Sequence, residues 1–205
     1  EHHGQTFPVG VAEWKLAENP HALRTTLGSC TGIVLYAPEQ KIGGIAHVLL
    51  GDPPPGRIVH RGKYARTALE GLLADFQKHN ITPASLRARL YGGASLFEVE
   101  NSSFFKKIGP GNVEAARQAL SAAGIRIIHE DTGGNVGRTI TLFMEDGRLL
   151  LRAGSKEQFI YKVNDLDLKA QIDATLADVE KLPALPSLVL RIQGMLQDPD
   201  VDIRA

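Results

Sequence analysis

Cysteine is almost absent from this sequence, since Cys30 is the single one among 205 residues. One thiol cannot form an intramolecular disulfide, which argues against a small secreted scaffold and favours a reducing, cytoplasmic setting. Long apolar runs are also missing, and no stretch approaches the roughly 20 residues that a membrane-spanning helix needs. The opening residues Glu1-His2-His3-Gly4 are polar with no apolar segment behind them, so we expect no signal peptide.

Neither sign of charge is in excess, because 23 lysines and arginines balance 23 aspartates and glutamates. The sequence therefore gives no electrostatic reason to expect binding to nucleic acid or to an anionic membrane surface. Apolar residues make up 43% of the chain, a proportion that is typical of a soluble domain with a buried core.

Short apolar runs between turn residues predict a domain rich in β-strands. Helical spacing predicts two amphipathic helices, one at 63–79 and one with Pro110 in its first turn. The strands are expected at 9–17, 31–36, 42–50, 86–91, 125–129, 139–144, 149–152 and 159–163. This order predicts an α+β fold: a mixed or antiparallel β-sheet core with two packed helices over 9–164, after an N-terminal tail at 1–8.

The sequence changes character at Asn164. Apolar residues at helical spacing predict a short C-terminal helical extension over 165–205, with a proline-rich break at 182–186. Two such helices cannot fully bury each other's apolar stripes. We therefore expect them to pack on the first domain, on another chain or on sequence beyond Ala205.

The segment Thr25-Thr26-Leu27-Gly28-Ser29-Cys30-Thr31-Gly32 places the cysteine among small residues just before a predicted strand. A substrate could reach a thiol there, and glycines would let a substrate carbonyl approach the backbone closely. The N–H groups around Gly28 and Ser29 could bind the oxyanion of a tetrahedral intermediate. The alternative is a buried, inert cysteine, which is common for this residue type.

A catalytic thiol needs a base, because a reference pKa of about 8.5 leaves it protonated at neutral pH. His47 is the candidate, in the middle of an apolar strand, although a hydrogen-bonded core histidine would look the same. A hairpin centred on Pro38-Glu39 would place position 30 opposite position 47. Directly opposed side chains lie about 5 Å apart at Cβ, so the pattern predicts a Cys–His pair.

Two glycine pairs, Gly92-Gly93 and Gly133-Gly134, lack the spacing of phosphate-binding loops. They are typical of tight turns that need positive φ, and the alternative is that they line a narrow substrate groove. The histidines lack metal-ligand spacing to one another, so no metal site is expected.

Six short blocks, in this order, resemble the CheD family of chemoreceptor glutamine deamidases over about Val9 to Val163. They are Leu27-Gly28-Ser29-Cys30, Gly43-Gly44-Ile45-Ala46-His47, Gly62-Lys63-Tyr64-Ala65, Tyr91-Gly92-Gly93-Ala94-Ser95, Ile108-Gly109-Pro110-Gly111-Asn112-Val113-Glu114 and Glu130-Asp131-Thr132-Gly133-Gly134-Asn135. The resemblance implies a sandwich fold of the cysteine-hydrolase type, with Cys30 as nucleophile and His47 as base.

The same resemblance implies a cytoplasmic enzyme that converts chemoreceptor glutamines to glutamates and releases ammonia, without a metal or organic cofactor. It also implies docking to chemoreceptor helices and to a CheC-type phosphatase. A rival interpretation is a non-catalytic adaptor with the CheD fold that binds a chemoreceptor or such a phosphatase. A further one is a deamidase whose tail directs it to a different glutamine-bearing protein.

A third catalytic residue is left open by the sequence. Some CheD members have an orienting threonine six residues before the cysteine, where this chain has Arg24. Thr25 and Thr26 follow directly, and either could supply the hydroxyl. Neighbouring residues of a strand face opposite sides, so only one of the two can point toward a given site.

The tail shows a second resemblance. Leu182-Pro183-Ala184-Leu185-Pro186-Ser187-Leu188-Val189-Leu190, followed by Asp198-Pro199-Asp200-Val201, is similar to the opening of an HDOD signalling domain. That resemblance implies a CheD–HDOD fusion of which the chain holds only the beginning of the second domain.

Overall fold

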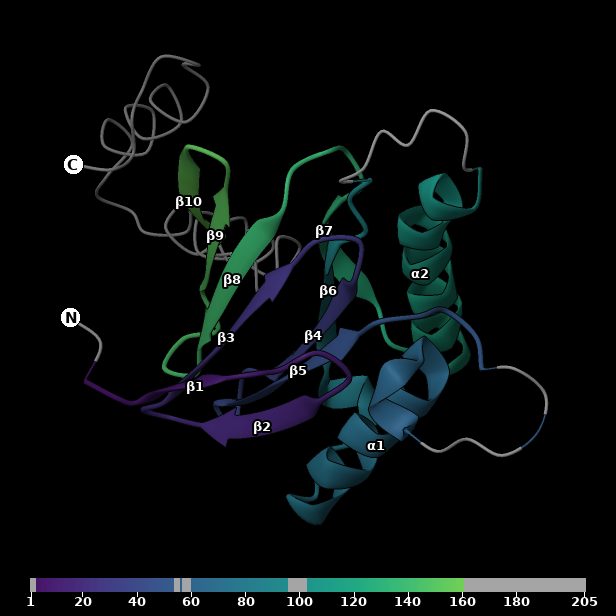
Figure 1. The fold of residues 1–205 in the computed structure, drawn as a ribbon. Helices are drawn as coiled ribbons and strands as arrows, with labels where there is room; N and C mark the ends of the chain where they lie inside the picture. The colour runs from purple at the N-terminus through teal and green to yellow at the C-terminus, as the bar shows by residue number, and fades with distance from the viewer. Residues whose placement is uncertain (1–2, 54–55, 57–59, 96–102, 161–205) are drawn as a thin grey trace, which may run out of the picture. The chain divides into compact units, whose positions relative to one another are not determined.

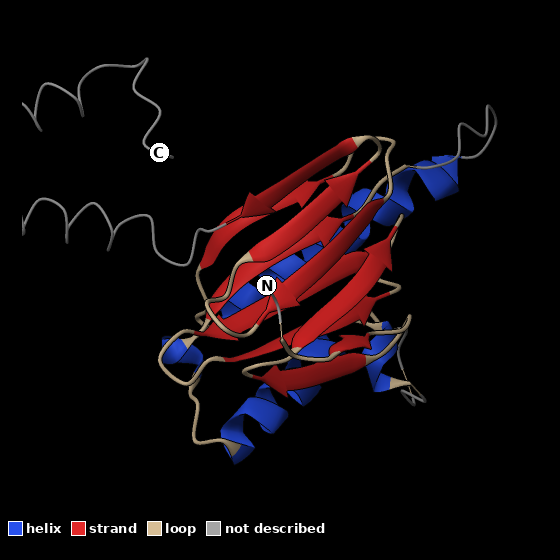
Figure 2. Ribbon diagram, turned by 90° about the vertical axis from the view of Figure 1, so that its left-hand side faces the viewer, coloured by secondary structure: helices blue, strands red, loops and turns tan. Residues whose placement is uncertain are grey.

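A computed structural model describes residues 3–53, 56, 60–95 and 103–160. Within them, two five-stranded sheets stack face to face, and two helices cover the outer face of one sheet (Figures 1 and 2). The predicted α+β class, with a mixed sheet core and two packed helices, is therefore confirmed. The predicted tail helices and the HDOD-like segment lie outside the described residues, so the proposed domain boundaries stay predictions.

The first sheet, called sheet A, has the strand order β1-β3-β8-β9-β10, in which only β1 and β3 run parallel. The second, called sheet B, has the order β2-β5-β4-β6-β7, in which only β6 and β7 run parallel. The strands of sheet A are β1 (Thr6–Pro8), β3 (Ala22–Leu27), β8 (Arg138–Phe143), β9 (Leu149–Ala153) and β10 (Lys156–Ile160). The strands of sheet B are β2 (Trp14–Glu18), β4 (Thr31–Ala37), β5 (Ile42–Val48), β6 (Arg87–Gly92) and β7 (Ile127–Thr132).

The helices α1 (Ala65–Lys78) and α2 (Ser103–Ala122) pack on sheet B, and two short 3-10 turns lie at Arg61–Lys63 and Pro83–Ser85. Strand β4 is buried on both faces, because alternate side chains enter different cores. Ile33 and Leu35 belong to the core beneath the helices, whereas Val34 and Tyr36 belong to the core between the sheets. The second of these cores, the inter-sheet core, borders the candidate site.

Three expectations about individual elements were wrong. Residues 22–27 form strand β3, which the sequence concealed because Arg24, Thr25 and Thr26 are consecutive polar residues. The predicted strand at 9–17 is a turn followed by β2, while β1 lies in the predicted tail and is too short to give a pattern. Helix α2 begins at Ser103, so Pro110 lies inside it, although proline is far commoner in a first turn.

Candidate functional site

The candidate nucleophile lies where the chain crosses from one sheet to the other. Gly28, Ser29 and Cys30 form the bend that joins β3 of sheet A to β4 of sheet B, and we call these residues the Cys30 bend. Cys30 is partly exposed and packs against the inter-sheet core. The thiol is therefore neither a fully buried core group nor a fully solvated one.

Three consecutive carbonyl groups of the Cys30 bend accept hydrogen bonds. The Ala94 N–H donates to Gly28 O at 2.9 Å, and the Gly93 N–H donates to Cys30 O at 2.8 Å. The Asn112 side chain donates to Ser29 O at 3.1 Å. All three tethers come from outside the bend, so its backbone is held at each peptide unit.

This anchoring also orients the N–H groups of the bend. A peptide's C=O and the following N–H point in opposite directions because the unit is planar and trans. The N–H groups of Ser29 and Cys30 therefore point away from Ala94 and Asn112, and neither donates to a backbone carbonyl of the described residues. Two adjacent N–H groups beside a thiol that are not bound to described backbone carbonyls can bind an oxyanion.

His47 lies on β5 with 3% of its surface exposed, and a threonine from the other sheet holds its ring. The Thr25 hydroxyl oxygen is 2.8 Å from His47 Nδ1 and also 2.8 Å from the Val9 carbonyl oxygen. A hydroxyl has one proton and a carbonyl can only accept, so Thr25 donates to Val9 and accepts from the His47 Nδ1–H. Nε2 then carries the lone pair, and it is buried with no hydrogen-bond partner among the described residues.

Cys30 and His47 lie at the same end of the β4–β5 hairpin, but the predicted register was wrong. Gly32, not Cys30, is opposite His47, because Ala37 pairs with Ile42 and the turn is four residues long. The centre of the hairpin therefore lies one residue beyond the predicted position, which shifts the pairing by two residues. A shift of two preserves the face, so both side chains lie on the side of sheet B that meets sheet A.

Burial sets the protonation states of this pair. Burial raises the pKa of the Cys30 thiol, and the cysteine's own backbone N–H opposes that shift. Burial lowers the pKa of His47, and the Val9 backbone near the ring opposes that shift. At neutral pH the resting pair is a thiol and a neutral imidazole, so the imidazole is free to accept a proton.

Strand alternation separates the two candidate threonines. Thr25 points inward between Leu23 and Leu27 and has 4% of its surface exposed, whereas Arg24 and Thr26 are on the outer face of β3. Thr26 hydrogen-bonds Thr139 across the strands there, at 3.0 Å between hydroxyl oxygens. The structure brings only Thr25 to His47.

The positive φ that one interpretation predicted for the glycine pairs is confirmed, and Gly92 is the last residue of β6. Gly92, Gly93, Gly133 and Gly134 all have positive φ, between 67° and 99°. Gly92 and Gly93 adjoin the Cys30 bend, and a Cβ added to Gly92 would collide with the Cys30 carbonyl oxygen. The Gly93 N–H is already committed to that same carbonyl, so it is a tether of the bend and not an oxyanion donor.

Sequence reasoning missed Asn112 and Val9. Asn112 is 2% exposed on α2 and reaches both Ser29 and Leu49, and its presence inside an otherwise apolar helix face was the available signal. Val9 contributes only its carbonyl oxygen, which a side-chain pattern cannot reveal.

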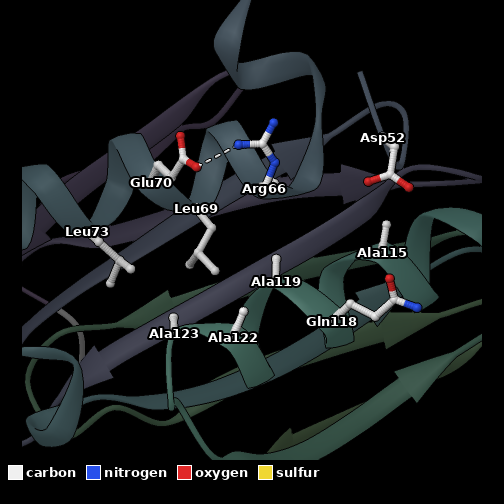
Figure 3. Close-up of a pocket in the computed structure, with 10 residues that line it drawn as sticks. All are labelled: Asp52, Arg66, Leu69, Glu70, Leu73, Ala115, Gln118, Ala119, Ala122 and Ala123. Carbon is white, nitrogen blue, oxygen red and sulfur yellow. Dashed lines mark hydrogen bonds and ion pairs between the residues drawn. The ribbon is translucent and has the colours of Figure 1, made fainter. Parts of the chain in front are cut away.

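A groove of about 430 Å³ lies between α1 and α2, on the helix-covered side of sheet B (Figure 3). Its walls are mostly aliphatic, and the Arg66–Glu70 ion pair, 3.0 Å long, lies at its edge. Neither Cys30 nor His47 lines it. The described residues contain no cluster of three potential metal ligands, and none of their helices is long and apolar enough to cross a membrane.

Comparison with known proteins shows which family the sequence is similar to. The family model described as CheD chemotactic sensory transduction matches residues 52–153. The probable chemoreceptor glutamine deamidase CheD of Methanococcus maripaludis is 40% identical over 148 residues, which cover 72% of this chain and 95% of the relative. The chemoreceptor glutamine deamidase CheD of Halalkalibacterium halodurans is 40% identical over 155 residues, covering 73% and 96%.

A third relative, the probable chemoreceptor glutamine deamidase CheD of Caldanaerobacter subterraneus, is 42% identical over 148 residues, covering 70% of this chain and 90% of the relative. Since these relatives are matched over nearly their full length at such identity, the chain belongs to the CheD family.

Proposed function

We propose that this protein is a chemoreceptor glutamine deamidase that converts glutamine side chains on the cytoplasmic helices of chemoreceptors to glutamates. The observation that carries the proposal is the His47 ring, whose Nδ1–H is bound by Thr25 while its buried Nε2 has no partner in the described residues. An unpaired buried acceptor costs about 1–3 kcal/mol, which a purely structural histidine has no reason to incur. The relatives' names supply the substrate class.

In the proposed first half-reaction, His47 Nε2 takes the proton of Cys30 as the sulfur attacks the carboxamide carbon of glutamine. The negative charge that develops on the carboxamide oxygen is bound by the N–H groups of Ser29 and Cys30. The tetrahedral intermediate then collapses, the C–N bond breaks, and the protonated His47 gives its proton to the departing ammonia. A thioester between Cys30 and the substrate remains.

In the second half-reaction, a water molecule attacks the thioester carbon while His47 Nε2 takes a proton from that water. The C–S bond breaks, the Cys30 sulfur recovers its proton, and the substrate leaves as glutamate. His47 begins and ends both half-reactions neutral, which fits a pKa lowered by burial. Thr25 keeps the proton on Nδ1 throughout, so the reactive nitrogen stays Nε2.

Mass spectrometry of a receptor cytoplasmic fragment tests the proposal. Each converted glutamine should gain about 1 Da and release one ammonia, since an amide nitrogen is replaced by oxygen. Cys30→Ala should abolish both signals. Wild-type protein that produces neither, or a Cys30→Ala variant that produces both, would show that the mechanism is wrong.

A non-catalytic adaptor is the rival proposal, and it drew its support from Arg24 at the position of the family's threonine. Arg24 lies on the outer face of β3, and Thr25 supplies the hydroxyl contact to His47. This geometry favours the enzyme. Binding to a CheC-type phosphatase and a cytoplasmic location remain part of the proposal, and co-purification with such a phosphatase tests the former.

A further inference from the structure

The Asn112 side chain bridges the two chain segments that carry the candidate nucleophile and base. Its Nδ2 donates to Ser29 O at 3.1 Å and to Leu49 O at 2.9 Å. Ser29 directly precedes Cys30, and Leu49 lies two residues beyond His47. One amide nitrogen therefore uses both of its protons to join these two segments.

We propose that Asn112 is a positioning residue, which fixes the Cys30 bend relative to the end of β5 and so sets the geometry of Cys30, His47 and the oxyanion donors. This inference rests on the deamidase function proposed above. It extends that function to a residue that would touch neither the substrate nor the reacting atoms.

The Ser29–Cys30 peptide explains why one tether would control two catalytic features. Its carbonyl is held by Asn112, and its N–H is one of the two candidate oxyanion donors. Because the peptide unit is planar, releasing the carbonyl lets the whole unit rotate, which displaces that N–H and the adjoining Cys30 thiol together. A displacement of about 1 Å at reacting atoms can reduce a rate about 100-fold.

Helix α2 is a firm support for this side chain. A Cβ on Gly109 would collide with the Gly93 carbonyl, and one on Gly93 would collide with Val113, so the helix lies directly against the 92–94 turn. That turn provides the other two tethers of the Cys30 bend, from Gly93 and Ala94. Both of these are backbone bonds, whereas the Asn112 tether is a side chain and can be altered separately.

Asparagine is suited to this position because one nitrogen offers two protons at a short, fixed reach. Asn112→Asp keeps the shape, removes both donors and places oxygens against two carbonyls. Asn112→Ala instead leaves room for water to satisfy the carbonyls without holding them together. The matched control is Gln118→Glu, the same amide-to-acid change on an exposed position of α2.

The experiment measures kcat and KM for deamidation together with the rate of Cys30 alkylation by iodoacetamide across pH, with folding checked by circular dichroism. Both Asn112 variants should lower kcat about 100-fold with KM little changed, and Gln118→Glu should match wild type. Their alkylation profiles should match that of His47→Gln, and adding His47→Gln should change them no further.

Several outcomes overturn the inference. Folded Asn112 variants with wild-type kcat and an unshifted alkylation profile show a purely structural residue, and so does failure of both variants to fold. Absence of deamidation by wild type refutes the proposed function instead. In that event the alkylation profiles of the free protein still decide whether Asn112 couples Cys30 to His47.

Discussion

Thr25 and His47 belong to different sheets, yet their side chains share a 2.8 Å hydrogen bond across the inter-sheet core. The Thr25 hydroxyl proton goes to Val9, whose own N–H donates to Arg24 O and thereby fixes the Val9 carbonyl beside β3. The direction of the Thr25 hydroxyl is thus imposed by the backbone, and it determines which nitrogen of the imidazole is the base.

The first prediction concerns that hydroxyl. Thr25→Val keeps the shape but leaves the His47 Nδ1–H without an acceptor, so the tautomer that carries the lone pair on Nε2 loses its advantage. We expect kcat for deamidation to fall by about 10–100-fold, while Thr25→Ser retains most activity. Thr26→Val is the control, because Thr26 faces outward. Equal activity in Thr25→Val and Thr26→Val would contradict the assigned role.

The second prediction concerns stability and pH. The pKa of His47 is lowered in the folded state, whereas unfolding restores it to about 6.5. The unfolded chain therefore binds more protons below that pH. The stability that neutral His47 contributes is complete above pH about 6.5 and is lost as the pH falls toward the lower pKa that His47 has in the folded state. Urea unfolding above and below pH about 6.5 should show that the free energy of unfolding falls less on acidification in His47→Gln than in wild type. An identical fall in the two proteins would exclude His47 as a source of this pH dependence.

The third prediction is a two-part alkylation profile for Cys30. General-base assistance by neutral His47 should give a plateau near neutral pH that persists below pH about 6.5 and disappears only on acidification through the lowered pKa of the folded protein's His47. A further rise should occur above the pKa of an ordinary thiol, about 8.5, because burial raises the pKa of Cys30. His47→Gln should remove the plateau and keep the upper rise. A wild-type profile with one titration near a free thiol would rule out base assistance.

The fourth prediction concerns Gly92, which has a φ of 99° and a neighbour that excludes any side chain. Gly92→Ala should lower the free energy of unfolding by more than about 2 kcal/mol, since it combines backbone strain with a collision against the Cys30 carbonyl. Gly133→Ala is the matched control: its φ is 76°, but a Cβ there meets nothing within 4 Å. If urea unfolding shows that both variants lose a similar free energy of unfolding, the collision at Gly92 is relieved at little cost.

The sequence was informative where chemistry depends on neighbouring residues and uninformative where it depends on distant ones. Cys30 in a small-residue bend and His47 in an apolar strand were visible as local patterns. The choice between Thr25 and Thr26 was not, because it depends on which face of β3 meets sheet B. Alternation would have decided it only once β3 itself was recognised, and three polar residues in succession concealed that strand.

The hairpin register and Asn112 show two further limits. Two extra residues in the 38–41 turn moved the partner of His47 from position 30 to Gly32, and turn length is the weakest part of a pattern-based prediction. The bonds of Asn112 reach across 83 and 63 positions of the chain, so they exist only after α2 has packed on sheet B. No local spacing encodes them.

The bend that carries Cys30 is one of the connections through which the chain passes from one sheet to the other, and this makes the sandwich itself a component of the site. The nucleophile lies in the bend between the sheets and the base belongs to sheet B, while the hydroxyl that orients the base belongs to sheet A. Any sliding of one sheet over the other would lengthen the Thr25–His47 hydrogen bond before a single strand was lost. A core substitution such as Leu142→Ala, far along β8, should therefore impair chemistry at temperatures where the protein is still fully folded.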